Sequence, residues 1–278
     1  MATQTRLPDR LVLVDDGSTD GSADLALEFA RSNHWAIVLR RPPRPPVRDR
    51  LAEANELKAF HWAVEQLDLR WDVIAKMDTD LDLAPATIET IEAAFLANPR
   101  LGLAGARLFE LAPDGSRLSM GSPRDHVEGA TKFYRRACWD EIAPIPPILG
   151  WDTLDEFHAR LRGWETESFP IPGGDPIHLR RMGTHDAILR SFRRWGVCAY
   201  GYGAHPLYVL FYGLRLMRRR RPRVVGGVNY ILGWVLAAFR RAPRADPQLR
   251  KAMRRSQLQR ARRRAIAVRR RSVAQAPR

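Results

Sequence analysis

Two stretches decide the fold: LVLVDDGS at residues 11–18 and VIAKMDTD at residues 73–80. Each is an apolar run of strand length that ends in carboxylates, and such continuous runs are typical of buried strands in a parallel sheet. An open α/β sheet binds its ligands outside the carboxyl ends of its strands. Two acidic strand ends at that edge suit a divalent cation and a phosphorylated ligand. The sequence therefore predicts an α/β fold with a site at this edge.

Strand-like and helix-like segments alternate up to about residue 110, and after it the spacing loosens through a Pro- and Gly-rich middle with shorter elements. Strands are expected at residues 11–14, 35–39, 72–77 and 101–108, and helices after residue 22 and at residues 51–67, 85–95, 154–161 and 184–195. Short apolar strands separated by amphipathic helices predict a mostly parallel sheet sandwiched by helices.

The composition excludes several classes of protein. Of the 278 residues 45% are apolar and 28% are charged, which fits an ordered globular chain rather than a disordered one. The two cysteines, Cys138 and Cys198, match neither a disulfide framework nor a metal-binding spacing. The first residues do not have the pattern of a secretory signal peptide. We therefore expect a cytoplasmic protein.

The net charge of +15 is concentrated near the C-terminus. Residues 215–278 contain 21 Lys and Arg and one acid, Asp246, whereas residues 1–214 contain 25 basic and 30 acidic residues. The body is mildly acidic, and a strongly basic tail follows it. This distribution argues against a nucleic-acid-binding face over the whole protein.

The tail also contains two apolar stretches, at residues 197–217 and 224–239. As a helix the second would be about 24 Å long, shorter than the roughly 30 Å hydrocarbon core of a bilayer. Arginines flank it, which favours an anionic membrane surface. We expect interfacial helices over residues 196–240 and an Arg-rich tail over residues 241–278. The protein would then lie peripherally or monotopically on the inner face of the cytoplasmic membrane.

The basic tail has two alternative interpretations. It could be a solvated or disordered extension, or it could bind nucleic-acid phosphates. Nucleic acid is the weaker alternative, because no aromatic side chain follows Phe239 to stack on bases.

The two acidic strand ends carry the chemistry. Asp78 and Asp80 offer the carboxylate oxygens that Mn²⁺ and Mg²⁺ prefer, and these cations bridge proteins to diphosphates. The alternative interpretation of Asp78 and Asp80 is a solvated acidic turn without a metal. Asp15, Asp16 and Ser18 could contact a nucleotide, or they could form an ordinary strand–turn–helix junction in which Ser18 caps the helix.

Three motifs in this order resemble glycosyltransferase family 2, whose members have the GT-A fold. They are VDDGSTDGS at residues 14–22, KMDTDLDLAP at residues 76–85 and GWDTLDE at residues 150–156. The resemblance covers roughly residues 10–200 and implies a GT-A-like domain over residues 1–195. One position departs from the pattern: Trp151 stands where relatives usually have a glutamate before the catalytic aspartate.

The resemblance implies a metal-dependent, inverting glycosyltransferase of the hexosyltransferase type. It would move a sugar from a nucleotide-diphosphate donor to a lipid-linked or polysaccharide acceptor, as in polysaccharide biosynthesis. The implied roles are a catalytic base at Asp152 with Asp155 beside it, nucleotide-sugar contacts at Asp15, Asp16, Ser18, Lys58 and Asp78, and Mn²⁺ or Mg²⁺ ligands at Asp78, Asp80 and His178.

Relatives in this family begin with a strand and a helix that precede the VDDGS strand, whereas only ten residues precede Leu11 here. The expectation is that this first strand and helix are missing and that donor binding is weak. Two alternative functions stay open: a catalytically degenerate, membrane-bound scaffold and a nucleotidyltransferase. The second would need a glycine-rich, basic phosphate-binding loop near the first strand.

Overall fold

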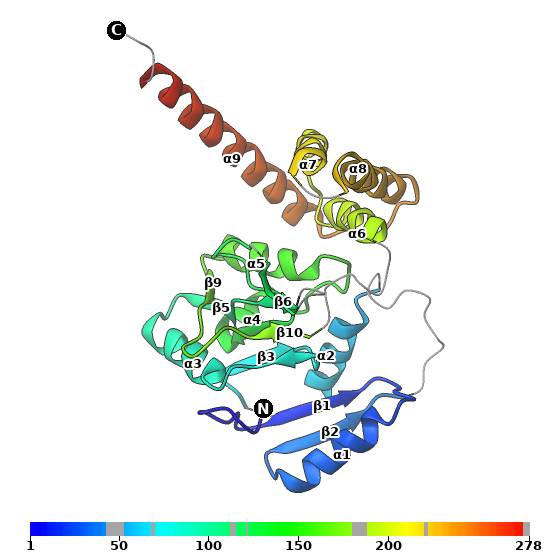
Figure 1. The fold of residues 1–278 in the computed structure, drawn as a ribbon, viewed down its shortest axis with the longest axis vertical. Coiled ribbons are helices and arrows are strands. Elements are labelled where there is room, and N and C mark those ends of the chain that lie inside the picture. Colours follow the sequence, from blue (N-terminus) through cyan, green and yellow to red (C-terminus); the bar gives the residue numbers. More distant parts are fainter. Residues whose placement is uncertain are drawn as a thin grey trace. The chain divides into compact units, whose positions relative to one another are not determined.

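The structure is a computed structural model that describes residues 1–42, 53–67, 70–111, 115–120, 122–179, 188–219 and 222–274. The chain forms two compact units (Figure 1). Unit 1 comprises Met1–Pro147 and Trp151–Met182, and unit 2 comprises Ile148–Gly150 and Gly183–Arg278.

Strands and helices alternate through most of unit 1. In chain order they are β1 (Leu11–Asp15), α1 (Ser22–Ser32), β2 (Ala36–Arg40), α2 (Asn55–Gln66), β3 (Val73–Met77), β4 (Leu81–Asp82), α3 (Thr87–Ala97), β5 (Leu101–Ala106), β6 (Phe109–Leu111), β7 (Arg117–Ser119), β8 (Thr131–Arg135), α4 (Arg136–Ile142), α5 (Trp151–Leu161), β9 (Glu165–Phe169) and β10 (Ile177–His178). The α/β class is thus as expected. Residues 51–52 of the expected second helix and residues 184–187 of the expected last helix lie outside the described residues.

Both four-stranded sheets are mixed, so the expectation of one mostly parallel sheet is wrong. The central sheet has the order β3-β8-β5-β9, with β8 antiparallel to both β3 and β5 and with β9 parallel to β5. A parallel neighbour needs a long crossover, usually a helix. Between β5 and β8 the described chain instead forms β6 and β7, an antiparallel pair, which leaves β8 to return in the opposite direction.

Helices cover both faces of the central sheet because its strands alternate their side chains. Phe133 of β8 packs with Ile91 and Phe95 of α3 on one face. The next residue, Tyr134, packs on the other face with Leu57 of α2 and with residues of α4 and α5. The helices on the second face carry the candidate catalytic residues.

The strand β1 pairs in parallel with β2 over Leu11–Asp15 and Ala36–Arg40, and these two form a separate sheet. No hydrogen-bonded ladder joins β1 to β3 in the part of the chain that the structure describes. The two acidic strand ends are therefore not delivered by neighbouring strands of one sheet, which was the expected reason for them to meet.

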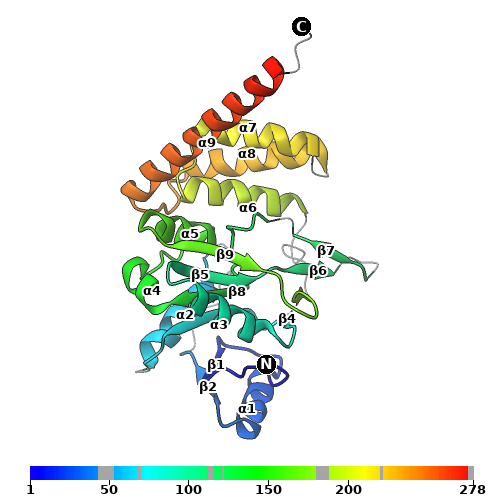
Figure 2. The ribbon, with the colours of Figure 1, turned by 90° about the vertical axis from the view of Figure 1, so that its left-hand side faces the viewer.

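Unit 2 is helical: α6 (Ile188–Gly201), α7 (Pro206–Arg219), α8 (Arg223–Phe239) and α9 (Pro247–Ala274) (Figure 2). Glycines allow close packing between these helices, since a Cβ at Gly233 would overlap the backbone of Arg193 and one at Gly227 would overlap that of Gly213. The domain boundary predicted at residue 195 falls inside α6 and stays a prediction. No helix among the described residues has an apolar run long enough to cross a membrane.

Candidate functional site

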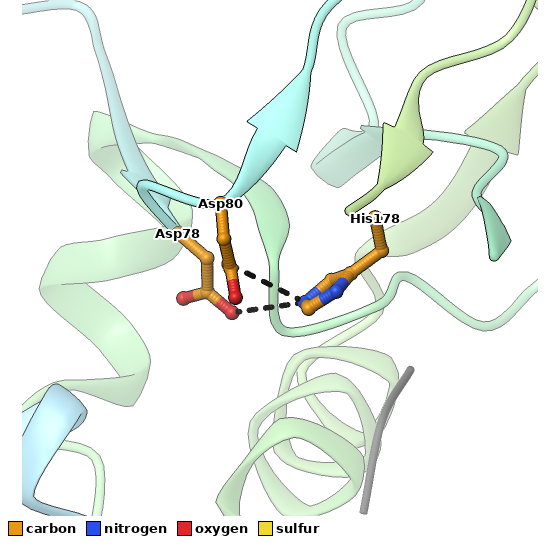
Figure 3. A group of neighbouring side chains, drawn as sticks. All are labelled: Asp78, Asp80 and His178. Atoms are coloured by element: carbon orange, nitrogen blue, oxygen red, sulfur yellow. Dashed lines mark ion pairs between the residues drawn. The ribbon is translucent and has the colours of Figure 1, made fainter. Parts of the chain in front are cut away.

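Asp78, Asp80 and His178 form the centre of the site (Figure 3). The two aspartates follow β3, and the short strand β4 comes directly after them. Antiparallel pairing of β4 with β10 places His178 opposite Leu81. The backbone N–H of Leu179 also donates to the backbone oxygen of Asp80 at 2.9 Å. Strand pairing thus carries a histidine from far along the chain to the acidic motif.

The side chains of these three residues converge, as Figure 3 shows. The Nε2 atom of His178 lies 3.9 Å from Asp78 Oδ2 and 3.6 Å from Asp80 Oδ1. One ligand atom from each residue lies within 4.8 Å of the others, and this is the one such group found in the described residues. Two carboxylates and an imidazole fit a divalent cation, and the imidazole favours Mn²⁺ over the strictly oxygen-seeking Mg²⁺.

Lys76 connects this centre to the rest of the site. It is buried in β3, and its ammonium donates to Oδ1 of Asp78 and, at 3.0 Å, to the backbone oxygen of Gly129. Burial alone would raise the pKa of Asp78, but His178 and Lys76 outweigh it and hold that pKa below its ordinary value. Asp78 is therefore a carboxylate ready to face a cation through its second oxygen.

Asp152 lies on the other side of Gly129. A Cβ at Gly129 would be 3.3 Å from the Cβ of Asp152 and 3.2 Å from the ring of Trp151, so the absence of a side chain permits this approach. Asp152 is in the first turn of α5, is partly buried, and accepts a hydrogen bond from the N–H of Thr153 at 3.0 Å. A chain of contacts from Asp78 through Lys76 and Gly129 thus links Asp152 to the acidic centre.

Trp151 is held between charged groups. Its indole N–H donates to Oε1 of Glu56 at 3.0 Å, and the ammonium groups of Lys76 and Lys132 lie 5.5 and 5.4 Å from its ring centre. Burial raises the pKa of Glu56. At position 151, where the resemblance leads us to expect a glutamate, the tryptophan instead hydrogen-bonds to a carboxylate of α2.

Asp155 lies in the core, so its surroundings differ from those of Asp152, and the catalytic role expected for it stays a prediction. Its carboxylate is fully buried on the inner side of α5, where it accepts hydrogen bonds from Lys132 Nζ at 2.8 Å and from the Tyr134 hydroxyl at 2.6 Å. Lys132 also donates to the backbone oxygen of Asp152 at 2.5 Å. These contacts of Asp155 anchor the helix that presents Asp152.

Glu156, next to Asp155, holds a second buried pair. Both ring nitrogens of His126 face carboxylates: Nδ1 lies 3.1 Å from Glu156 Oε1, and Nε2 lies 3.5 Å from Glu128 Oε2. Burial by itself would lower the pKa of His126, but hydrogen bonds and charge from Glu128 and Glu156 outweigh it and raise this pKa to about 10. His126 is therefore an imidazolium at neutral pH.

This arrangement predicts how stability depends on pH. A histidine whose pKa rises on folding stabilises the native state fully below its unfolded value near 6.5, and the contribution is lost as pH rises through the folded value, about 10. We expect His126→Gln to lower the free energy of unfolding at pH 6, with the difference from wild type shrinking up to pH 10.5. Urea unfolding over this range measures it. His34→Gln, at an exposed position, is the control, and a difference that does not change with pH would contradict the prediction.

Of the other nucleotide-binding candidates, three lie at or just after the end of β1 and the fourth lies on α2. Ser18 donates its backbone N–H to Asp15 Oδ1 at 2.9 Å, which lowers the pKa of Asp15. Arg41, beyond the end of β2, binds Asp16 at 2.7 Å. Lys58 lies on α2 and pairs with Glu53 at 3.6 Å. The roles of Asp15, Asp16, Ser18 and Lys58 in donor binding stay predictions.

Sequence reasoning missed Lys76, Lys132 and Glu56. For the two lysines a signal existed, because each interrupts an apolar strand (VIAKM and TKFYR), and a lysine in a buried strand needs a counter-charge nearby. Lys76 and Lys132 are direct cross-strand partners in the β3–β8 pair. For Glu56 the sequence offers no local signal, since its contact with Trp151 depends on how α2 packs.

Residues 1–117 match the family model of glycosyl transferase family 2. The resemblance is confirmed over that part of the chain. Among solved structures, the chain is similar to the mannosyltransferase PcManGT from Pyrobaculum calidifontis in complex with GDP-Man and Mn²⁺. The TM-score is 0.51 at 12% identity, and the likeness covers 86% of this chain and 69% of the other. At this identity it shows a shared fold, that of the GT-A glycosyltransferases.

A second similar structure is GalNAc-T7 with UDP, GalNAc and Mn²⁺. The TM-score is 0.49 at 12% identity, and the likeness covers 83% of this chain and 52% of the other. No curated protein sequence matches the chain significantly.

Proposed function

We propose that this protein is a metal-dependent, inverting glycosyltransferase that uses a nucleotide-diphosphate sugar. The observation that supports this most is the convergence of Asp78, Asp80 and His178, linked to Asp152 through Lys76 and Gly129, in a fold shared with known glycosyltransferases. The match of residues 1–117 to glycosyl transferase family 2 supports the same proposal.

Asp152 is the proposed general base. It takes the proton of the acceptor hydroxyl as that oxygen bonds to the anomeric carbon of the donor. The bond from this carbon to the diphosphate oxygen breaks on the opposite side, and the nucleotide diphosphate leaves with the electron pair, so the configuration inverts. A cation held by Asp78, Asp80 and His178 would supply positive charge for the departing diphosphate. The ammonium of Lys76, fixed beside Asp78, orients that carboxylate.

The proposed acceptor is a lipid-linked or polysaccharide glycan at the inner face of the cytoplasmic membrane. Support for a membrane setting comes from unit 2, where arginine-rich segments flank apolar helices.

The proposed function is tested by thermal unfolding of the full chain with a panel of nucleotide-diphosphate sugars and Mn²⁺. A ligand at a hundred times its Kd adds about 2.7 kcal/mol to the stability, which is a rise in Tm of roughly 5–10 °C for a protein of this size. One donor should stabilise the protein, and EDTA should reverse the effect. Stabilisation by nucleoside triphosphates alone would favour a nucleotidyltransferase instead, and no stabilisation by any ligand would favour a degenerate scaffold.

A variant carrying both Asp80→Asn and His178→Gln is expected to lose the Mn²⁺-dependent part of this stabilisation. The change removes two of the three converging ligands while keeping side chains of similar size. The matched control is Asp82→Asn, an exposed acid two residues along the same motif. Full Mn²⁺ dependence in the double variant would place the cation elsewhere.

A further inference from the structure

Unit 2 exposes a row of large apolar side chains along its helices α7 and α8. We name this set the docking face; its members are Leu207, Leu210, Phe211 and Leu214 of α7 and Val224, Val225, Val228, Leu232, Val235 and Phe239 of α8. Phe239 is 86% exposed, Leu207 67% and Phe211 64%. Soluble proteins rarely leave so many large apolar side chains together in water, so such a face marks an interaction surface.

The spacing of these residues puts them on one side of each helix. On α8 the exposed positions recur every three or four residues from Val225 to Phe239, which is the repeat of a single helical face, and Val224 adjoins the first of them. The opposite side of α8 packs closely on α6, since a Cβ at Gly226 would lie 2.9 Å from the ring of Phe192 and one at Gly233 would overlap the backbone of Arg193. The docking face on α8 therefore points away from the helix that supports it.

The helix α7 extends this surface. It packs closely beside α8, since a Cβ at Gly213 would lie 2.7 Å from Ile231 and one at Gly227 would lie 2.4 Å from Met217. Both views show α7 and α8 side by side (Figures 1 and 2). Two adjacent helices, each with an exposed apolar side, make a surface wider than one helix.

The charges around the docking face select its partner. Arg218 and Arg223 are exposed near one end of α8, and Arg240 and Arg241 are exposed at the other. Asp246 is the single acid in residues 188–219 and 222–274. An apolar surface with a cationic border is complementary to a bilayer with anionic headgroups, where the apolar side chains enter the acyl boundary and the arginines meet phosphates.

The length of α8 fits a helix that lies in the plane of the bilayer. Its 17 residues span about 25 Å, less than the roughly 30 Å hydrocarbon core. Its mid-helix residues Val228, Leu232 and Val235 are as much a part of the docking face as those at its ends, so the face runs along the helix.

We propose that the docking face binds flat on an anionic lipid bilayer and that α7 and α8 enter one leaflet without crossing it. This inference deepens the proposed function, on which it rests for the idea that the acceptor is presented by a membrane. Binding at this face would hold the enzyme at the surface where a lipid-linked acceptor is found.

The experiment is flotation of the full chain with vesicles of phosphatidylcholine alone or with added phosphatidylglycerol. Wild type should float with the anionic vesicles. A variant carrying Phe211→Gln and Phe239→Gln should partition roughly a hundredfold more weakly, about tenfold for each phenylalanine removed from the acyl boundary. Both side chains are exposed, so the fold should survive, which circular dichroism and the thermal unfolding midpoint check.

The matched control is Leu96→Gln, an apolar residue of α3 in unit 1 that is 81% exposed and lies outside the docking face. It should float like wild type. The pair Arg223→Gln and Arg240→Gln should reduce binding to anionic vesicles only. Flotation of the phenylalanine variant at the wild-type level would overturn the proposal, because binding would then come from the basic tail.

Two other results would also overturn it. One is a wild type that does not float. The other is a wild-type dimer in light scattering that the phenylalanine variant converts to a monomer, since the face would then be covered by a second copy. Failure of the glycosyltransferase proposal is recognised separately: no donor would stabilise the chain, whether or not it floats.

Discussion

Asp152→Asn is expected to lower the rate of glycosyl transfer by roughly a thousandfold, within the range that general-base catalysis contributes. The amide cannot take the proton of the acceptor hydroxyl. It can still accept the hydrogen bond from the N–H of Thr153, so the first turn of α5 should keep its shape. Donor binding should change little, because the cation ligands Asp78, Asp80 and His178 are untouched.

Initial rates with the donor found by thermal unfolding, together with the Tm shift caused by that donor, measure both parts of this prediction. The control is Asp140→Asn, an exposed acid of α4 that pairs with Arg136. Transfer at the wild-type rate by Asp152→Asn would move the base to another residue, and the first to test would be Glu56. A lost Tm shift would mean that Asp152 contributes to donor binding.

Asp155→Ala is expected to destabilise the protein by about 3–5 kcal/mol, the typical cost of leaving a buried charge without its partner. Lys132 is fully buried, and it would lose its ion pair with Asp155. Its more distant ion pair with Glu156, at 3.5 Å, would remain. The Tyr134 hydroxyl would also lose its acceptor. Urea unfolding followed by circular dichroism gives the difference in free energy.

A second variant separates the lost pairing from the lost volume. In Asp155→Ala combined with Lys132→Met the buried ammonium is absent, so a good part of the stability should return. Equal destabilisation by the single and double variants would show that the charge pair is unimportant and that the cavity dominates. Because Lys132 also binds the backbone of Asp152, the double variant, which lacks that bond, should lose activity at temperatures where it is still folded.

The local elements of the fold could be predicted because short-range patterns control them. Short apolar runs predicted the strands β1, β2, β3 and β5, and apolar residues at helical spacing predicted α2, α3 and α5. The direction of β8 could not be predicted in this way. Strand direction depends on the path of the connection, and residues 107–130 have no clear periodicity.

The candidate site also combines features that local sequence predicts with features that only packing decides. The D-x-D motif is local, so its two carboxylates could be named from the sequence alone. Asp152 and Asp155 are one helical turn apart, and the sequence could not tell their environments apart. Packing of β8 against α5 decided that Asp155 meets Lys132 in the core while Asp152 stays beside Gly129.

The sequence by itself determined which residues carry the charges and which short segments can become strands and helices, since both depend on neighbours within a few positions. The tertiary structure alone decided which charges meet. It paired β4 with β10 and brought His178 to Asp80, it divided the strands among separate sheets, and it turned the apolar sides of α7 and α8 outward. The physical reason is that contacts between distant segments depend on the packing of the whole chain, which no local pattern encodes.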